Sequence, residues 1–114
     1  MKLGFIGAGN MGGAILKGII AGGKIGANDI FIRNSSDNST QNVAQKNGVQ
    51  ACGSLKELAQ KSDIVFIGVK PYLVAKVLEE IKDELKNKIV ISMAASVEIR
   101  DIEAIIPETK VVRI

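Results

Sequence analysis

The chain of 114 residues contains no histidine and a single cysteine, Cys52. Histidine is the usual side chain for proton transfer near neutral pH, and histidine and cysteine are the usual zinc ligands. Their scarcity excludes a histidine-based catalytic triad and a cysteine–histidine metal site within this chain. A lone cysteine also excludes an internal disulfide, so we expect a cytoplasmic protein. Its chemistry must come from a cofactor, a partner chain or residues beyond Ile114.

Aromatic residues are also scarce, at 4% of the chain, and tryptophan is absent. So few rings cannot build a base-stacking surface, and the net charge of +3 comes from lysines interleaved with acidic residues. Both observations argue against a nucleic-acid partner. No apolar run approaches the ~20 residues that span a bilayer, so we expect no membrane partner. The composition, 46% hydrophobic and 24% charged, is typical of one globular domain.

Short apolar runs alternate along the chain with longer segments of helical spacing. The apolar runs predict strands at residues 2–7, 29–33, 49–51, 63–69, 88–93 and 110–114. The helical patterns lie at residues 10–23, 36–48, 54–61, 72–85 (with Pro71 in the first turn) and 97–106. Apolar strands separated by helices predict a parallel sheet covered on both faces. We therefore expect an α/β fold over residues 1–114, a doubly wound parallel sheet (Rossmann fold) of about six strands in the order 3-2-1-4-5-6.

Four glycines occur within ten residues, FIGAGNMGGA, between the first predicted strand and the first predicted helix. Gly7, Gly9 and Gly12 form the pattern G-x-G-x-x-G. In this position the first glycine permits a tight turn, the second lets backbone approach a pyrophosphate, and the third allows close helix packing. A glycine-rich turn without a ligand is the alternative. The strand, motif, helix and second strand fit the unit of about 30 residues that dinucleotide sites need, which favours dinucleotide binding.

The end of the second predicted strand bears on which dinucleotide is bound. It is followed by Arg33, Asn34, Ser35 and Ser36. An NAD site normally has an acidic residue there to hold the ribose 2′-OH, but Asp29 lies at the wrong end of the strand and Asp37 comes four residues late. Arginine with amide and hydroxyl donors suits a 2′-phosphate. The segment favours NADP (NADPH), with NAD as the second option; a solvated polar loop is the alternative.

Two further loops follow predicted strands at the same edge of the sheet, where open α/β sheets bind ligands. The fourth strand is followed by Val69, Lys70 and Pro71, and the fifth by Met93, Ala94, Ala95 and Ser96. The small side chains of the second loop let a ligand approach the backbone. A catalytic amine at Lys70 is conceivable, but a lone lysine at a strand end is more often solvated, and we assign no catalytic residue.

Four segments together resemble the N-terminal half of the pyrroline-5-carboxylate reductases: GFIGAGNMGGAILKGII, VKP, ISMAASV and VVRI. The resemblance covers all 114 residues. It implies reduction of the C=N bond of 1-pyrroline-5-carboxylate to L-proline with NADPH or NADH, in proline biosynthesis. It also implies that the pyrophosphate lies at Ile6, Gly7, Ala8, Gly9, Asn10 and Met11. Asn34 and its neighbours would meet the adenine ribose, and Val69–Pro71 with Ala94–Ala95 the nicotinamide.

The sequence departs from that family at three places. Ser96 stands where the family usually has glycine, and Leu55 where some members carry a polar contact to the cofactor. Family members also continue beyond the VVRI strand into a helical domain that forms the dimer and much of the substrate site. We therefore expect a truncated cofactor domain that binds cofactor without turnover and forms homo-oligomers only through the missing domain. The cofactor domain of a 3-hydroxyacid dehydrogenase relative and a stand-alone NADP-binding regulatory module remain open alternatives.

Overall fold

The computed structural model describes the backbone of residues 1–7 and 10–114 and the side chains of residues 1–7 and 12–114. Its strands are β1 (Leu3–Ile6), β2 (Ile30–Arg33), β3 (Gln50–Ala51), β4 (Ile64–Ile67), β5 (Ile89–Ser92) and β6 (Lys110–Arg113). They form one sheet in the order β3-β2-β1-β4-β5-β6, and all five pairings are parallel. The predicted strand order is thereby confirmed.

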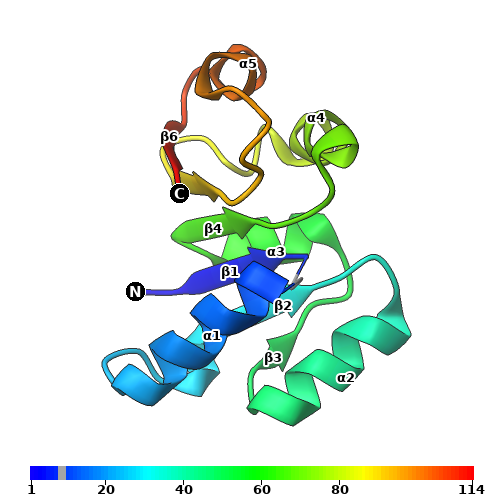
Figure 1. Ribbon diagram of the computed structural model, residues 1–114, viewed down its shortest axis with the longest axis vertical. Coiled ribbons are helices and arrows are strands. Elements are labelled where there is room, and N and C mark those ends of the chain that lie inside the picture. The colour runs from blue at the N-terminus through cyan, green and yellow to red at the C-terminus, as the bar shows by residue number, and fades with distance from the viewer. Residues whose placement is uncertain (8–9) are drawn as a thin grey trace.

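Five α-helices cover the two faces of this sheet (Figure 1). They are α1 (Asn10–Gly22), α2 (Asp37–Asn47), α3 (Leu55–Lys61), α4 (Pro71–Ile81) and α5 (Ile99–Ile105). Helices α1 and α2 pack on one face, and α3, α4 and α5 pack on the other. A short 3₁₀ helix, η1 (Ala27–Asp29), precedes β2. This is the doubly wound arrangement, in which every strand ends at the same edge of the sheet.

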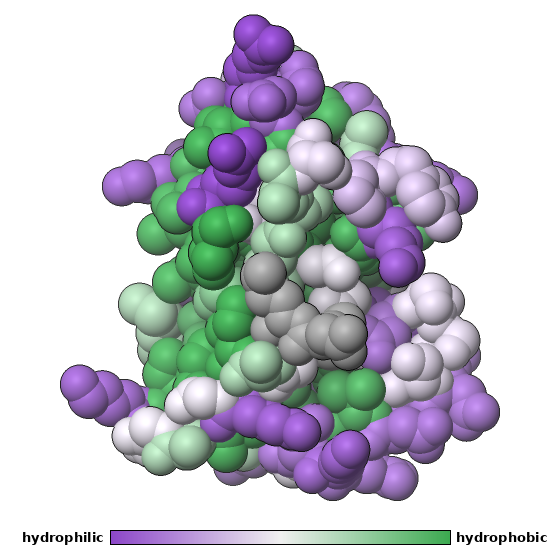
Figure 2. All heavy atoms as spheres, in the orientation of Figure 1, coloured by the Kyte–Doolittle hydropathy of each residue, from purple (hydrophilic) through white to green (hydrophobic). Residues whose placement is uncertain are grey.

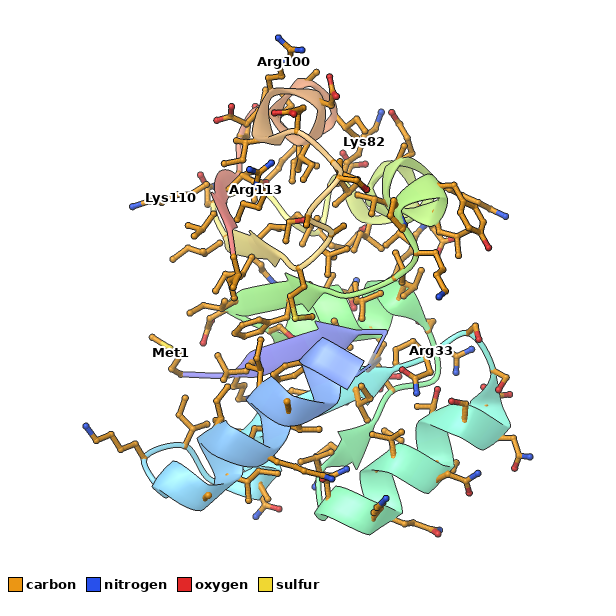
Figure 3. All side chains as sticks on the ribbon, viewed as in Figure 1. Met1, Arg33, Lys82, Arg100, Lys110 and Arg113 are labelled. Carbon is orange, nitrogen blue, oxygen red and sulfur yellow. The ribbon has the colours of Figure 1, made fainter. Side chains whose placement is uncertain are left out.

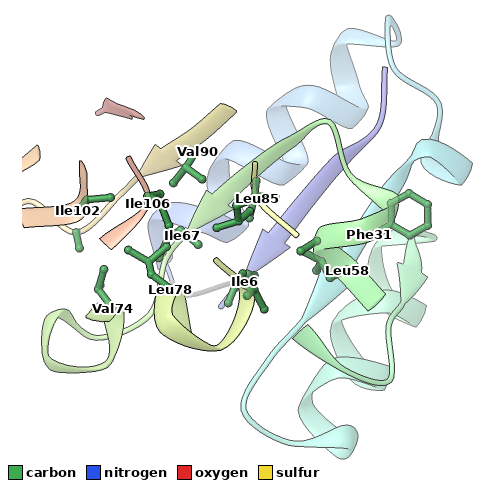
Figure 4. Close-up of a cluster of buried hydrophobic side chains, with 14 of the residues drawn as sticks. Ile6, Phe31, Leu58, Ile67, Val74, Leu78, Leu85, Val90, Ile102 and Ile106 are labelled. Carbon is green, nitrogen blue, oxygen red and sulfur yellow. The ribbon is translucent and has the colours of Figure 1, made fainter. Parts of the chain in front are cut away.

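The larger hydrophobic cluster lies between the sheet and helices α3, α4 and α5 (Figure 4). It joins Ile6 of β1 to Leu58, Leu78 and Ile102, one from each helix, and all four side chains are buried. Full burial of such a side chain contributes about 1.5–3 kcal/mol relative to exposure. The cluster therefore fixes α4, whose first turn reaches the carboxyl edge of the sheet.

The second cluster lies under α1 and α2 and is centred on two phenylalanines. Phe5 of β1 and Phe66 of β4 are register partners, and their rings stack with centroids 4.6 Å apart. Leu16 of α1 and Ala44 of α2 belong to the same cluster. This stacking holds β1 and β4 together close to their carboxyl ends, where the loops that follow them begin.

Side-chain caps fix where two helices begin. Ser36 caps α2 by accepting from the backbone N–H three residues on, at 3.1 Å, and Gly48 ends that helix at φ 70°. Ser54 caps α3 in the same way through the N–H of Glu57. The Glu57 carboxylate accepts in return from the N–H of Gly53 at 2.7 Å, one residue before the serine. This reciprocal pair is the capping box that the sequence predicts, with its second bond shifted by one residue.

The predicted end of the fourth helix is wrong. Helix α4 ends at Ile81, whereas the apolar spacing predicts a helix to Leu85. Leu85 is still fully buried, but its carbonyl accepts from the Thr109 hydroxyl at 2.7 Å. The chain turns here toward β5 and passes through Asn87 at φ 63°. The Leu85 N–H still donates to the Ile81 carbonyl at 3.1 Å, so the chain continues in turns beyond the regular helix and keeps Leu85 on the buried side.

Hydrophilic side chains cover the outer surface around α5 and along α2, and hydrophobic ones show beside α1 and the strands next to it (Figure 2). Among the described side chains, the large hydrophobic ones that are exposed are Met1, Tyr72, Val112 and Ile114. None of the described helices combines the length and the apolar character that crossing a membrane requires.

Candidate functional site

A hollow of about 660 Å³ lies at the carboxyl edge of the sheet, where β1, β4 and β5 end. Nine residues predicted from the sequence line it: Gly7, Gly12, Asn34, Ser35, Val69, Lys70, Pro71, Ala94 and Ala95. Five others complete the lining: Ser39, Gly68, Leu73, Met93 and Ser96. The hollow is thus built by the segments that follow four adjacent strands, β2, β1, β4 and β5, and by the first turns of α1 and α2.

The bottom of this hollow is a contact between two glycine-containing loops. Gly7 follows β1 at φ 78°, a backbone conformation that side chains other than hydrogen rarely permit. Gly68 follows β4, and its N–H donates to the Ile6 carbonyl at 2.8 Å. A Cβ atom at Gly68 would lie 2.5 Å from the Gly7 oxygen and 2.7 Å from Cε of Met93. No side chain fits there without a shift of backbone.

Helix α1 starts at the same place. Its first turn contains Gly12, where a Cβ atom would lie 3.1 Å from the Gly7 oxygen. The close approach predicted for the third motif glycine is therefore present. The first turn carries no acidic residue. A helix N-terminus offers free N–H groups and a partial positive charge, which attract phosphate. This geometry suits a pyrophosphate.

Four of the predicted pyrophosphate residues are not described in full. Ala8 and Gly9 lie outside the described residues. For Asn10 and Met11 only the backbone is described, within the first turn of α1. Their role in binding stays a prediction.

The segment after β2 is held by its own hydrogen bonds. The Asn34 side-chain amide donates to the Ser39 hydroxyl at 2.9 Å, and the Asn34 N–H donates to the Thr40 hydroxyl at 2.9 Å. Ser36 lines neither this hollow nor the one beside it, because its hydroxyl caps α2. The segment presents Asn34 and Ser35 to the hollow in a fixed conformation.

Arg33 forms an ion pair with Asp37, which was expected to lie too far along the chain to take part in this segment. Its Nη1 donates to the Asp37 carboxylate at 2.6 Å and to the Cys52 carbonyl at 3.4 Å. Helix α2 begins directly after its cap at Ser36. Its first residue, Asp37, therefore lies beside Arg33 although it is four positions later in the sequence. The segment after β2 therefore includes a carboxylate, although it is not at the position of the NAD-type acidic residue.

A second hollow of about 370 Å³ adjoins the first and shares four lining residues with it: Asn34, Ser35, Val69 and Leu73. Its further walls include the apolar side chains of Ile6, Leu55 and Val77, and its charged lining residues are Arg33, Lys76 and Glu80. Apolar walls with a charged rim suit a flat heterocyclic base beside a charged group. For the part of this wall that α4 supplies, the apolar spacing of that helix is the one indication in the sequence.

The loop after β5 forms the opposite wall of the larger hollow. Met93 donates its N–H to the Ile67 carbonyl at 2.9 Å, and Ala94 donates to the Ser92 hydroxyl at 3.2 Å. Ala94 is buried, and Ala95 is exposed. The loop therefore brings backbone, the methyl groups of two alanines and the Met93 side chain to the hollow.

Few groups in the described part of the site can transfer a proton. Among the described residues that line the larger hollow, Lys70 carries the one ionisable side chain, and it is exposed at the N-cap of α4. Burial raises the pKa of the Cys52 thiol to about 11, and the charge of Glu57 adds to this effect, so the thiol is no nucleophile. The described residues hold no cluster of potential metal ligands. The described residues of the site are thus suited to binding and orienting a ligand.

The chain is similar to a family of oxidoreductases and to individual reductases. A family model described as "NADP oxidoreductase coenzyme F420-dependent" matches residues 2–96. The whole chain is 40% identical to pyrroline-5-carboxylate reductase 3 of Danio rerio and covers 40% of it.

Solved structures of reductases are also similar to this chain. A pyrroline-5-carboxylate reductase from Coxiella burnetii superposes with a TM-score of 0.90 at 34% identity, over 98% of this chain and 42% of that one. The Plasmodium falciparum pyrroline carboxylate reductase, solved with NADP bound, superposes with a TM-score of 0.85 at 32% identity, over 99% and 41% of the two chains. The chain thus spans about two fifths of the length of these relatives.

Proposed function

The chain belongs to the family of NADP oxidoreductases described as coenzyme F420-dependent, and we propose that residues 1–114 are the cofactor-binding domain of a pyrroline-5-carboxylate reductase. The substrate would be 1-pyrroline-5-carboxylate and the product L-proline. The observation that carries this proposal is the hollow whose bottom is the Gly7–Gly68 contact and whose walls are the loops after β4 and β5. The identity to named reductases along the whole chain supports the substrate class.

The proposed cofactor is NADP, with NAD as a weaker ligand. Gly7, Gly12 and the start of α1 would hold the pyrophosphate, because a helix N-terminus offers free N–H groups and the two glycines add no side chain of their own there. Arg33, Asn34 and Ser35 would meet the adenosine ribose and its 2′-phosphate beside the smaller hollow. An arginine guanidinium is the side chain that matches phosphate geometry best.

The nicotinamide would lie in the larger hollow between the loop at Val69, Lys70 and Pro71 and the loop at Ala94 and Ala95. When bound, the reduced cofactor supplies the hydride for the imine carbon. The residues of this chain bind and orient it, and they exclude water from one side of the ring. We also propose a cytoplasmic location and a homo-oligomer formed by parts of the enzyme outside this chain.

Binding and substrate class can be tested separately. In calorimetry at equal ionic strength, we expect the chain to bind NADPH more tightly than NADH. For the substrate, residues 1–114 replace the matching segment of the Coxiella burnetii relative, whose structure superposes over 98% of this chain. We expect this chimera to oxidise NADPH in the presence of 1-pyrroline-5-carboxylate.

The two measurements have different contrary outcomes. A folded chain that binds neither nucleotide contradicts the cofactor proposal. A folded chimera that binds NADPH but leaves 1-pyrroline-5-carboxylate unreduced contradicts the reductase proposal and favours a regulatory module that binds NADP without turnover.

A further inference from the structure

The Arg33–Asp37 ion pair sits beside the proposed position of the 2′-phosphate. Figure 3 shows Arg33 near the carboxyl end of β2 and the start of α2. The Arg33 side chain is 17% exposed and lines the smaller hollow, whereas the Asp37 side chain is 86% exposed and lines neither hollow. The carboxylate therefore contacts the guanidinium from the solvent side.

The pair is set by the backbone around it. Asp37 is the first residue of α2, and the cap by Ser36 fixes where that helix begins. Thr40 binds both the Ser36 carbonyl and the Asn34 N–H, at 2.7 and 2.9 Å, so the turn between β2 and α2 is closed by hydrogen bonds. The turn thus places the backbone of Asp37 beside Arg33, and the two side chains meet there with Nη1 2.6 Å from the carboxylate.

Arg33 does not depend on Asp37 for its placement. Its Nη1 also donates to the Cys52 carbonyl at 3.4 Å, a contact from β3's loop within the fold. Its backbone lies at the end of β2, and its carbonyl accepts from the Gly7 N–H at 3.0 Å. The guanidinium keeps a second anchor if the carboxylate is removed.

We propose that Asp37 is a specificity-determining residue, whose carboxylate competes with the cofactor's 2′-phosphate for Nη1 of Arg33. This inference rests on the proposed NADP site. A phosphate that approaches Arg33 meets a guanidinium already partly neutralised, and it is repelled by the neighbouring carboxylate. NAD has a hydroxyl at this position, so its binding is affected little. Asp37 thereby reduces the ratio of the affinity for NADP to the affinity for NAD.

An opposite role for Asp37 would be to orient Arg33 toward the phosphate. Two observations disfavour it: the carboxylate is on the solvent side, and the Cys52 carbonyl already holds the same Nη1. Under the orienting role, removal of the carboxylate weakens binding of the 2′-phosphate; under competition it strengthens it. The sign of one change separates the two roles.

The test uses two small probes that differ only in the 2′-phosphate, adenosine 2′,5′-bisphosphate and adenosine 5′-monophosphate. Calorimetry compares the wild-type chain with Asp37→Asn, the charge-retaining Asp37→Glu, and the control Asp83→Asn. Asp83 is exposed and pairs with Lys86 outside both hollows. We expect Asp37→Asn to raise the affinity for the bisphosphate about three- to tenfold and to change the affinity for the monophosphate by less than about 1.5-fold.

Asp37→Glu and Asp83→Asn should resemble the wild type for both probes. In an Arg33→Met background, the gain from Asp37→Asn should disappear, because no guanidinium remains to compete for. Circular dichroism establishes that each variant is folded, and the monophosphate affinity shows that its adenosine site is intact.

Unchanged or weaker bisphosphate binding by folded Asp37→Asn would overturn the inference, as would equal tightening of both probes. A gain that persists undiminished in the Arg33→Met background would also overturn it, because the carboxylate would then act without Arg33. Failure of the wild-type chain to bind either probe or NADPH is a separate result that contradicts the proposed cofactor site itself.

Discussion

At Gly68, the lack of a side chain lets the loops after β1 and β4 touch. A Cβ atom there would lie 2.5 Å from a backbone oxygen, which cannot move aside as a flexible side chain could. The same loop leads into Val69, Lys70 and Pro71 of the proposed nicotinamide wall. This position therefore couples the stability of the fold to the shape of the site.

We expect Gly68→Ala to lower the free energy of unfolding by about 1–3 kcal/mol, as overpacking does, and to weaken NADPH binding. The measurement is urea unfolding followed by calorimetry on the folded protein. Gly13→Ala is the matched control, because a Cβ atom at Gly13 of α1 meets nothing within 4 Å. Its expected effect is neutral or a gain of up to about 1 kcal/mol. Equal losses for the two variants would contradict this reading.

Cys52 predicts a loss of stability in alkali. Burial raises the pKa of its thiol from 9.0 to about 11 in the folded chain, in which Cys52 is 2% exposed. Below pH 9 the thiol is protonated in both the folded and the unfolded chain, and its full contribution to the free energy of unfolding is present. Between pH 9 and 11 the unfolded chain releases a proton that the folded chain keeps, so the free energy of unfolding falls by about 2–3 kcal/mol.

This fall is measured by urea unfolding at pH 8.5 and pH 11, for the wild type and for Cys52→Ala. Lysines titrate in both proteins, so the difference between the two falls isolates the thiol. We expect the wild type to lose more stability than the variant. Identical falls would show that the thiol ionises in the folded chain as readily as in the unfolded one.

Among the site residues, the sequence indicated the three loops but not all of their contacts. Gly68 could have been predicted as a site residue, because it is a glycine directly after a buried strand and directly before the VKP segment. The Arg33–Asp37 pair was missed because linear spacing suggested separation, whereas a helix that starts at Asp37 brings the two together. The wall from Leu73 and Val77 depends on how α4 packs, which a single sequence does not specify.

Among the elements, strands were predictable as short runs with a polar or glycine boundary; β1, β2, β4 and β5 are buried or half-buried apolar runs, whereas the edge strands β3 and β6 are exposed or half-buried. Every observed strand lies within its predicted range. The end of α4 was not predictable, because Leu85 is buried whether or not its backbone is helical. Beyond the helix, the Leu85 carbonyl accepts from the Thr109 hydroxyl across 24 positions of sequence. Such a bond leaves no local pattern.

Helix α3 offers a test of capping at the scale of one element. We expect Ser54→Ala to lower the free energy of unfolding by about 1 kcal/mol, because the N–H of Glu57 loses its acceptor. The matched control is Ser35→Ala, an exposed serine outside any helix, which should change stability by less than about 0.5 kcal/mol. Chemical denaturation measures both. A Ser54→Ala variant as stable as the control would mean that tertiary packing alone fixes the start of α3.

For the whole molecule, we expect the chain alone to bind NADPH and to reduce 1-pyrroline-5-carboxylate at least about a thousandfold more slowly than the chimera. Hydride transfer requires donor and acceptor carbons held roughly 3–3.5 Å apart, and such positioning is worth about 7–11 kcal/mol. Among the described residues of the larger hollow, only Lys70 is ionisable. One charged group on one wall cannot hold a small anionic substrate that closely.

Stopped-flow or steady-state measurement of NADPH absorbance gives this comparison, with mass spectrometry to exclude a contaminating host reductase. A rate for the purified chain equal to that of the chimera would show that these 114 residues contain a complete substrate site.

The place of β1 between β2 and β4 has a consequence for how the chain folds as it is synthesised. Leu3 pairs with Ile30 on one side and with Ile64 on the other, so β1 obtains its second neighbour only after the chain has been translated as far as Ile64. Until then, Phe5 lacks the ring of Phe66 that stacks on it. Loop closure over such a separation is slow compared with local helix formation. The nascent β1–α1–β2 unit therefore has one unpaired sheet edge, along β1. A chaperone that covers this edge during translation would raise the yield of folded protein.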